Sequence, residues 1–326
     1  MSENSSFHTF QNTSVLVTGA SGFIGRHLVA SLVGYGAQVL GLSKTPSSDP
    51  LSFDGDVTKM PEVLAAFDQS EKRHSRPLDY IFHLAGQKNP ALAHQHPRES
   101  LELSILGCLN LFEAARQQKN KVRKIIVVSS LAVYGTVEDQ SGTLLKEDQL
   151  LKGDSIYSVS KIAPEYISRA YWGEYGIPTV VARLANVYGP GQSPEAVISS
   201  LIQQMLAGGN LKLGNMHSVR DFTFVEDIAE GLMALSLKES IEGKAFNLGS
   251  GHYYAISEIV ECLVDLTGFK GAILTEVDRV RAQEKSFLVP DIKAFLKATG
   301  WQPKHTLKAG LARTLEAFRA QQIKNI

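Results

Sequence analysis

The sequence predicts an α/β protein in which a doubly wound parallel sheet is followed by a smaller C-terminal α/β part. Two observations support this prediction. Short β-branched apolar runs alternate with amphipathic helical segments through the first half of the chain, which is typical of a parallel sheet covered on both faces. A glycine-rich turn joins the first apolar run to the first helix. We therefore expect a dinucleotide-binding domain at residues 1–186, to which residues from about 220 to 250 return, and a mainly substrate-binding domain at residues 187–326.

The first expected strand, Val15–Val17, leads directly into a turn with three glycines at G-x-x-G-x-x-G spacing, Gly19, Gly22 and Gly25. Gly19 permits a tight bend, Gly22 lets bare backbone approach a pyrophosphate, and Gly25 lets the next helix pack closely on the strand. The phosphates would then lie at the positive end of that helix. This pattern predicts dinucleotide binding on a Rossmann-type sheet, with further contacts from Ser21, Phe23 and Ile24.

The remaining elements follow in order along the chain. Four further apolar runs predict strands at Gln38–Leu42, Tyr80–Leu84, Lys124–Ser129 and Thr179–Arg183. Amphipathic spacing predicts helices around Pro61–Phe67, Glu102–Gln118, Ala196–Ala207 and Ser257–Thr267. Residues 43–55, rich in Ser, Thr, Pro and Asp, are predicted to form a loop.

Segments that follow strand ends should gather in one place, because ligands of parallel sheets bind beyond the carboxyl ends of the strands. Four segments stand at such positions. We expect one cleft to be lined by Thr18–Gly25, Ala85–Lys88, Ser129–Tyr134 and Asn186–Gly191.

The balance of charge argues against a polyanionic partner. Lys+Arg and Asp+Glu each count 33, so no net field attracts nucleic acid or an anionic membrane. The N-terminus lacks a signal-peptide pattern, and no apolar run reaches membrane-spanning length. Cys108 and Cys262 are far apart and predict free thiols in a reducing compartment. We expect a cytoplasmic protein with no nucleic-acid partner, no membrane partner and no metal site, since the histidines form no ligand pattern.

The segment Tyr157-Ser-Val-Ser-Lys161 predicts the chemistry. Residues four apart on a helix share a face. An ammonium close to a phenol favours the phenolate, which lowers a phenol pKa that is ordinarily about 10. Tyr157 then becomes a usable general acid or base. A lone Y-x-x-x-K can also be an ordinary solvated pair, but its position after the glycine turn and the Ser129-Ser130 strand end favours catalysis.

Further motifs are spread over nearly the whole chain. They are Asp56-Val57, His83–Gly86, Val127–Gly135, Arg183–Pro190, Arg220–Thr223, Phe246–Gly249 and Gly300–Pro303. With the glycine turn and Tyr157–Lys161, they make the sequence resemble the extended short-chain dehydrogenases/reductases, the NAD-dependent epimerase/dehydratase family that modifies nucleotide sugars. Within that family, the segments 189–199 and 214–223 look most like the GDP-6-deoxy-D-mannose (4-keto) reductases.

The resemblance implies a role for each matching residue. Ser130 would hydrogen-bond the reacting oxygen while Tyr157 exchanges its proton, and Lys161 would hold the nicotinamide ribose and tune Tyr157. Asp56 would face the adenine. The other cofactor contacts that the resemblance implies are Val57, Leu84, Ala85, Gly86, Ser104, Val128, Leu184 and Val187. It also implies a homodimer formed through two helices per subunit.

The end of the second strand predicts the choice of cofactor. An NAD-preferring protein usually places a carboxylate there, to accept from the ribose 2′-hydroxyl. This strand ends instead in Ser43 and Lys44. Ser43 can donate to a 2′-phosphate, and Lys44 can neutralise it, with Arg26 as the alternative. The expected cofactor is therefore NADP(H), with NAD as the alternative.

The residues after Ser130 indicate the reaction. Dehydratases of the family carry an acidic residue there for a second proton transfer, whereas this chain has Leu131 and Ala132. Glu138 and Asp139 in the next loop stay open as substitutes. The expected reaction is NADP(H)-dependent reduction of the C4 ketone of a nucleotide-linked 4-keto-6-deoxyhexose. The alternative is a nucleotide-sugar 4-epimerase that acts through a transient 4-keto intermediate with retained NAD(P).

Substrate contacts are expected mainly from donors, because a diphosphate suits bidentate arginine. By resemblance, Arg220 and Arg281 face the diphosphate, and Asn186 can donate to the same group. The other expected substrate contacts are Gln87, Gln192 and Ser130. The chain departs from the family pattern at three positions, with Ser104 in place of Asn, Gly86 in place of Ala, and Pro164, which should kink the active-site helix.

Overall fold

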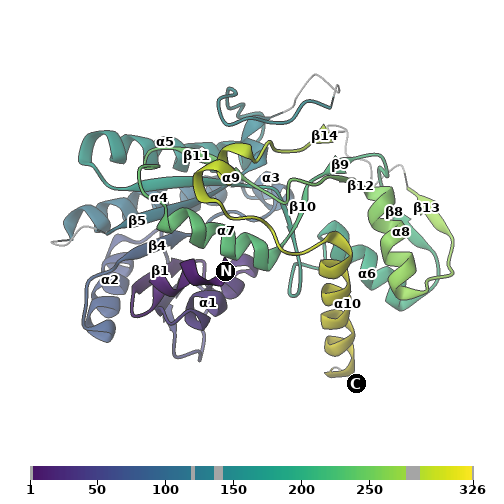
Figure 1. Ribbon diagram of the computed structural model, residues 1–326, viewed down its shortest axis with the longest axis horizontal. Helices are drawn as coiled ribbons and strands as arrows, with labels where there is room; N and C mark the ends of the chain where they lie inside the picture. The colour runs from purple at the N-terminus through teal and green to yellow at the C-terminus, as the bar shows by residue number, and fades with distance from the viewer. Residues whose placement is uncertain (1–2, 119–121, 136–141, 277–286, 325–326) are drawn as a thin grey trace.

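The protein is described by a computed structural model that covers residues 3–118, 122–135, 142–276 and 287–324 (Figure 1). A seven-stranded sheet forms its centre, with the strand order β11-β6-β5-β4-β1-β2-β3 and every neighbouring pair parallel. The strands are β1 (Ser14–Thr18), β2 (Gln38–Ser43), β3 (Ser52–Asp54), β4 (Tyr80–His83), β5 (Lys124–Ser130), β6 (Thr179–Leu184) and β11 (Ala245–Leu248). The prediction of a doubly wound parallel sheet is confirmed, and the chain reverses its direction of travel across the sheet beside β1.

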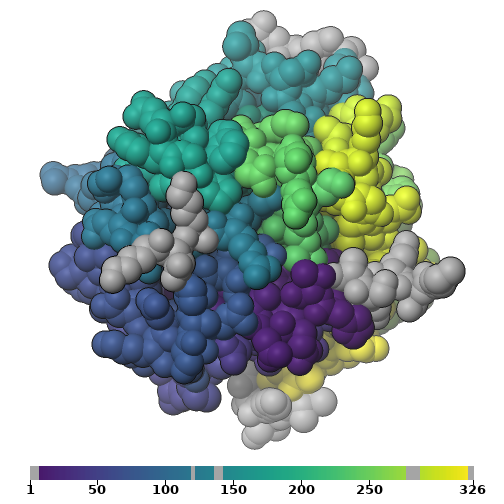
Figure 2. Space-filling view, turned by 60° about the vertical axis from the view of Figure 1, so that its left-hand side comes forward, coloured from purple at the N-terminus to yellow at the C-terminus, as the bar shows by residue number. Residues whose placement is uncertain are grey.

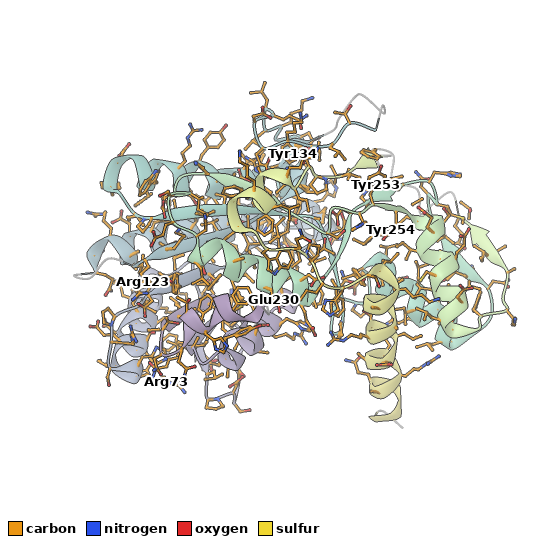
Figure 3. All side chains as sticks on the ribbon, viewed as in Figure 1. Arg73, Arg123, Tyr134, Glu230, Tyr253 and Tyr254 are labelled. Carbon is orange, nitrogen blue, oxygen red and sulfur yellow. The ribbon has the colours of Figure 1, made fainter. Side chains whose placement is uncertain are left out.

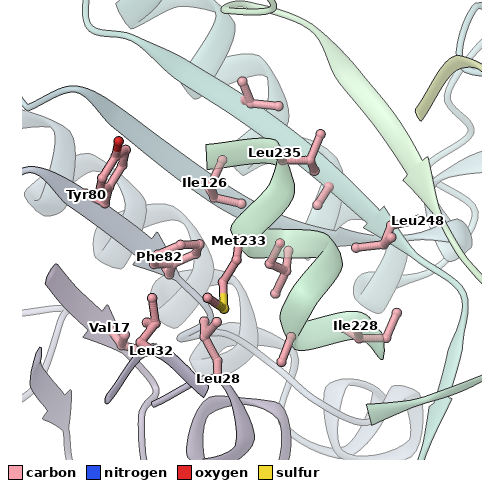
Figure 4. Packing of buried hydrophobic residues seen from close by; sticks show 14 of the residues in the cluster. Val17, Leu28, Leu32, Tyr80, Phe82, Ile126, Ile228, Met233, Leu235 and Leu248 are labelled. Atoms are coloured by element: carbon pink, nitrogen blue, oxygen red, sulfur yellow. The ribbon is translucent and has the colours of Figure 1, made fainter. Parts of the chain in front are cut away.

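Helices cover both faces of the sheet because successive residues of each strand point to opposite sides. In β1, Val15 and Val17 join a core with Leu28 of α1, whereas Leu16 joins a second core with Phe112 of α4. The first face is covered by α1 (Phe23–Gly34), α7 (Val225–Leu237) and α9 (Lys293–Thr299), and the second by α2 (Met60–His74), α4 (Pro97–Gln117) and α5 (Ile156–Tyr175). Figure 4 shows α7 packed over the strands and beside Leu28 and Leu32.

A smaller part with its own core lies at one end of the sheet, on the right in Figure 1. Its helices are α6 (Val197–Ala207), α8 (Ile256–Thr267) and α10 (Leu307–Lys324). Its strands pair as β8 (Leu211–Leu213) with β13 (Ile273–Thr275), and as β9 (Val219–Arg220) with β12 (Tyr254–Ala255) and β14 (Phe287–Leu288). Between the two parts, β7 (Asn186–Tyr188) pairs with β10 (Phe222–Phe224). The short helices η1 (Glu3–Phe10), α3 (Pro90–Gln95) and η2 (Leu131–Tyr134) complete the described elements.

One expected loop is partly a strand. Ser52–Asp54 form β3 and pair with β2, although residues 43–55 have the composition of a loop. Backbone pairing to the open edge of β2 does not depend on side-chain type, so composition alone could not predict this short edge strand. Farther along, β11 joins the sheet beside β6, whereas β10 pairs with β7 outside it. The domain boundary at residue 186 stays a prediction.

Pro164 does not interrupt the active-site helix. The helix α5 is continuous from Ile156 to Tyr175, and Pro164 is buried within it. Proline cannot donate to the carbonyl of Ser160 one turn earlier. The carbonyl of Pro164 itself is well used, because it accepts from Ser168 Oγ at 2.6 Å and faces Cys108 Sγ of α4 at 3.9 Å. The neighbouring helix thus supports the turn that proline weakens.

Candidate active site

At the three glycines of the turn after β1, the surrounding backbone leaves no room for a side chain. Gly19 has a φ of +70°, and a Cβ there would lie 2.8 Å from the Ala85 nitrogen. A Cβ on Gly25 would lie 2.2 Å from the Gly19 oxygen, and one on Gly22 would lie 3.0 Å from it. Gly22 is the N-cap of α1, so the turn presents bare backbone at the positive end of that helix. This geometry fits a dinucleotide pyrophosphate.

The end of β2 is more crowded than the sequence indicates. Ser43 Oγ accepts a hydrogen bond from the Ser21 nitrogen at 2.9 Å, which ties the strand end to the glycine turn. Lys44 Nζ lies 3.1 Å from Asp56 Oδ2, with the lysine side chain 82% exposed. Burial raises the pKa of Asp56, but hydrogen bonds from Thr58 and the nearby Lys44 outweigh it and hold that pKa below its ordinary value. An ionised carboxylate therefore competes for the lysine expected to bind a 2′-phosphate.

Lys44→Ala should weaken NADPH more than NADH. Loss of an exposed charge-assisted contact to phosphate costs about 1 kcal/mol, so we expect a roughly fivefold larger rise in Kd for NADPH. Fluorescence titration of both reduced cofactors measures it. Lys59→Ala is the matched control, because Lys59 is also exposed and pairs with Glu62 at 3.0 Å. Equal weakening of both cofactors by Lys44→Ala would remove the phosphate-binding role.

Ser130, Tyr157 and Lys161 come together at the carboxyl end of the sheet. Ser130 ends β5, and its side chain shares a hydrogen bond with Tyr157 of α5. Lys161 follows one turn later, with Nζ 5.8 Å from the centre of the Tyr157 ring. Ser155 caps this helix, accepting from the Ser158 nitrogen at 3.1 Å. The three predicted catalytic side chains thus lie in one place. Their catalytic roles stay predictions.

The expected direction of the Tyr157 pKa is wrong for this structure. Burial raises the pKa of Tyr157 above its ordinary value, and the hydrogen bond with Ser130 only partly offsets this. Burial also lowers the pKa of Lys161 to about 8. Both residues are half-buried. Desolvation disfavours both charges, and it outweighs the attraction that sequence spacing alone predicts.

The space around Lys161 explains one departure from the family pattern. A Cβ on Gly86 would lie 3.2 Å from Lys161 Nζ and 3.8 Å from Ser104 Oγ, so glycine makes room for the ammonium. Ser104 Oγ is buried and has no hydrogen-bond partner within the described ranges. His83 Nδ1 lies 2.8 Å from Thr18 Oγ1, and burial together with the charge of Lys161 lowers its pKa to about 4. His83 is thus a neutral structural residue.

These features fit the ribose end of a nicotinamide dinucleotide. No carboxylate of the described residues forms an ion pair with Lys161, so its donors are open to ribose hydroxyls. The unpartnered Ser104 hydroxyl lies on the same side of Gly86. The other predicted cofactor residues lie in the first turn of α1 or near strand ends: Phe23, Ile24, Val57, Leu84, Ala85, Val128, Leu184 and Val187.

The predicted substrate residues differ in whether their polar groups already have hydrogen-bond partners within the protein. Asn186 is exposed at the start of β7, and Arg220 lies in β9, where its Nη1 donates to the Val219 oxygen at 2.8 Å. The Gln87 amide donates to Ser100 Oγ at 3.0 Å, and the Gln192 amide donates to the Val187 oxygen at 2.6 Å. Both amides therefore already have protein partners. Arg281, Glu138 and Asp139 lie outside the described residues.

Asp221, which follows Arg220, is a site residue that sequence reasoning missed. It is fully buried and accepts from the Ser250 and Gly251 nitrogens at 3.0 and 2.9 Å and from Thr223 Oγ1 at 2.8 Å. Burial raises its pKa, although these hydrogen bonds oppose the shift. The contacts fix the strand that carries Arg220 against the loop after β11. Its place in the motif Arg220–Thr223 was the only available signal.

A buried polar network behind the active-site helix was also missed. Arg183 of β6 pairs with Glu165 of α5 through two nitrogens, at 3.1 and 2.8 Å. Glu165 also accepts from Ser129, the neighbour of Ser130. Arg183 donates in turn to Tyr134, whose hydroxyl donates to Asn247 at 2.7 Å (Figure 3 labels Tyr134). The end of β5 is thereby fixed from behind.

Within the described ranges, no group of three or more His, Cys, Asp and Glu side chains could hold a metal ion. None of the helices in that part of the chain is both long and apolar enough to cross a membrane.

The parallel sheet and the glycine turn at the start of α1 define the class: a Rossmann-type dinucleotide-binding protein. The chain belongs to the NAD dependent epimerase/dehydratase family, whose model matches residues 15–249. It is thus an NAD(P)-dependent enzyme, and the predicted family is confirmed.

Several relatives cover almost the full length of the chain. A putative UDP-glucose 4-epimerase of Methanocaldococcus jannaschii is 30% identical over 92% of this chain and 97% of its own. The GDP-6-deoxy-D-mannose reductase of Pseudomonas aeruginosa is 28% identical over 94% of this chain and 97% of its own. The structure of RMD from Pseudomonas aeruginosa complexed with NADPH has a TM-score of 0.81 and 27% identity, and it covers 95% of this chain and 100% of its own.

Proposed function

We propose that this enzyme reduces the C4 ketone of a nucleotide-linked 4-keto-6-deoxyhexose with NADP(H). The observation that carries the proposal is the placement of Tyr157 and Lys161 together, with Lys161 Nζ 5.8 Å from the Tyr157 ring, while the non-acidic Leu131 and Ala132 follow Ser130. Burial holds the pKa of Tyr157 above its ordinary value, which agrees with a proton donor. A protonated phenol suits an enzyme that gives a proton to a ketone oxygen, whereas oxidation of an alcohol needs a base at that position. Two similarities support the proposal: one to the GDP-6-deoxy-D-mannose reductase of Pseudomonas aeruginosa, and one to the structure of RMD complexed with NADPH.

In this mechanism the residues of the chain act on the oxygen of the ketone. When bound, the reduced cofactor supplies the hydride that the carbonyl carbon accepts. Tyr157 donates its proton to the oxygen as negative charge develops, and Ser130 stabilises that charge with a hydrogen bond. Lys161 orients the ribose and stabilises the phenolate that remains on Tyr157.

Water elimination is not part of the proposal. Leu131 is buried and Ala132 is partly buried in η2, directly after Ser130. Neither side chain can exchange a proton, and elimination needs a second proton transfer beside that of Tyr157. Of the residues of this chain, a ketone reduction needs only Tyr157, Ser130 and Lys161, with the hydride supplied by the reduced cofactor.

The second candidate is a nucleotide-sugar 4-epimerase that acts through a transient 4-keto intermediate with retained NAD(P). A specific observation favours it: the relative from Methanocaldococcus jannaschii, at 30% identity, is a putative UDP-glucose 4-epimerase. An epimerase oxidises and reduces the same carbon, so it consumes no cofactor in a full cycle.

Cofactor stoichiometry separates the two candidates. We expect the purified enzyme to consume one NADPH per product when it is given GDP-, UDP-, dTDP- or CDP-linked 4-keto-6-deoxyhexoses, because the hydride stays in the product. Reduced cofactor is followed by absorbance, and product by chromatography. Product formed from a nucleotide 4-hydroxy sugar without loss of reduced cofactor would establish the epimerase instead.

The substrate contacts proposed for the diphosphate are Arg220, Arg281 and Asn186, because guanidinium and amide donors match phosphate oxygens.

A homodimer in the cytoplasm is also part of the proposal. Large apolar side chains remain exposed on α4 and α5, which pack side by side on the face shown in Figure 2. They include Leu106 of α4 and Val159 and Tyr166 of α5, the last two on one face of that helix, and a second copy of the chain would bury them.

A further inference from the structure

The first turn of α1 contacts the loop formed by residues 189–192, which follows β7. His27 Nε2 lies 2.9 Å from the Pro190 oxygen, and because a carbonyl only accepts, Nε2 carries the proton. Arg26 Nη2 donates to the Gly191 oxygen at 3.4 Å, and its Nε donates to the Gly22 oxygen at 3.5 Å. Arg26 therefore joins the glycine turn to the loop.

Two glycines allow the 189–192 loop to make this contact. Gly191 has a φ of +79°, and a Cβ there would lie 2.9 Å from Arg26 Nη1. On its other side, a Cβ on Gly189 would lie 2.5 Å from Val225 Cγ1, at the start of α7. Only glycines fit both positions, so the loop packs tightly between α1 and α7. Gln192 closes the loop, since its nitrogen donates to the Gly189 oxygen at 3.2 Å.

The same loop connects to the smaller part of the molecule. The loop follows β7, which contains the predicted ligand contacts Asn186 and Val187. At the other end of the loop, Gln192 Oε1 accepts from Ser199 Oγ of α6 at 3.5 Å. Arg26, which contacts the loop from α1, is exposed and forms no ion pair within the described residues. A change at the phosphate-binding turn therefore has a short path, through Arg26 and His27, to the residues expected to hold substrate.

We propose that Arg26 and His27 are positioning residues that fasten the 189–192 loop to the cofactor turn and make cofactor occupancy and substrate affinity interdependent. The part concerning substrate rests on the proposed function, in that the substrate carries a nucleoside diphosphate. Coupling of this kind is reciprocal, because each ligand changes the affinity of the other by the same factor. Neither residue touches the reacting atoms.

Hydrogen–deuterium exchange tests the fastening itself. In Arg26→Ala/His27→Ala we expect the backbone amides of residues 187–196 to exchange at least about fivefold faster, because the loop loses its bonds to α1. Val33→Ala is the control, since Val33 is an exposed residue of the same helix. NADPH, and NADH in parallel, should slow this exchange in the wild type but not in the double variant. Unchanged exchange in the double variant would overturn the proposal.

Nucleotide binding tests the interdependence. We expect saturating NADPH to lower the Kd for GDP or UDP about fivefold in the wild type, measured by calorimetry. The factor should fall to within twofold of one in the double variant, and Arg26→Lys should keep part of it. A merely structural residue would change both Kd values without changing their ratio, and an unchanged ratio would refute the coupling. Exchange is measured without turnover, so a wild type that reduces no 4-keto sugar but shows the expected exchange contradicts only the proposed function.

Discussion

Tyr157→Phe is expected to lower kcat for ketone reduction by about 10²–10⁴-fold, the usual contribution of a general acid. Phenylalanine keeps the ring that Lys161 faces at 5.8 Å but has no proton to give. NADPH affinity should stay within about twofold, since no phosphate or adenosine contact is assigned to the hydroxyl. Steady-state kinetics and fluorescence titration measure the two quantities on the same preparation.

The controls for this experiment come from the same cluster. Ser130→Ala should lower kcat less than Tyr157→Phe does, because it removes a hydrogen bond and leaves the acid. Turnover of Tyr157→Phe close to that of the wild type would show that another group supplies the proton.

In the wild type, activity should fall as the pH rises through about 8, because Lys161 is charged below that pKa and neutral above it.

Glu165→Ala should give the largest loss of stability, about 3–5 kcal/mol in the free energy of unfolding. The substitution leaves the Arg183 guanidinium buried without its carboxylate, and it removes the acceptor of Ser129. Urea denaturation followed by circular dichroism measures the change. Activity should fall as well, because the end of β5 carries Ser130.

An exposed ion pair provides the comparison. Glu102 pairs with Arg98 at 2.7 Å on the surface of α4, and Glu102→Ala should cost below about 1 kcal/mol. A loss of the same small size in Glu165→Ala would mean that Arg183 finds water or another acceptor. The role assigned to the buried network would then fail.

The sequence predicted those parts of the fold that depend on local pattern. The strand β1, the glycine turn and the start of α1 follow from apolar periodicity and from glycine spacing, and the structure has them where they were expected. Ser130 lies at a strand end, where parallel topology places ligand contacts, and α5 brings Tyr157 and Lys161 to it by packing on β5. The catalytic role of this cluster stays a prediction.

What the sequence did not reveal depends on neighbours distant in the chain. The pair formed by Lys44 and Asp56 requires β3, an edge strand whose composition indicates a loop. The Tyr157 pKa depends on how much protein surrounds the phenol, and spacing on a helix contains no information about that. The bond from the Gln87 amide to Ser100 Oγ likewise depends on the neighbouring helix α4, and substrate contact by Gln87 stays a prediction.

The position of β11 has a consequence for synthesis of the protein. Its residues, Ala245–Leu248, come late in the chain but form the sheet edge beside β6, and α7 directly before them covers one face. A nascent polypeptide leaving the ribosome therefore cannot close its first sheet until most of the message has been translated. Until then the outer edge of β6 is unpaired, and an unpaired strand edge favours aggregation of the incomplete chain.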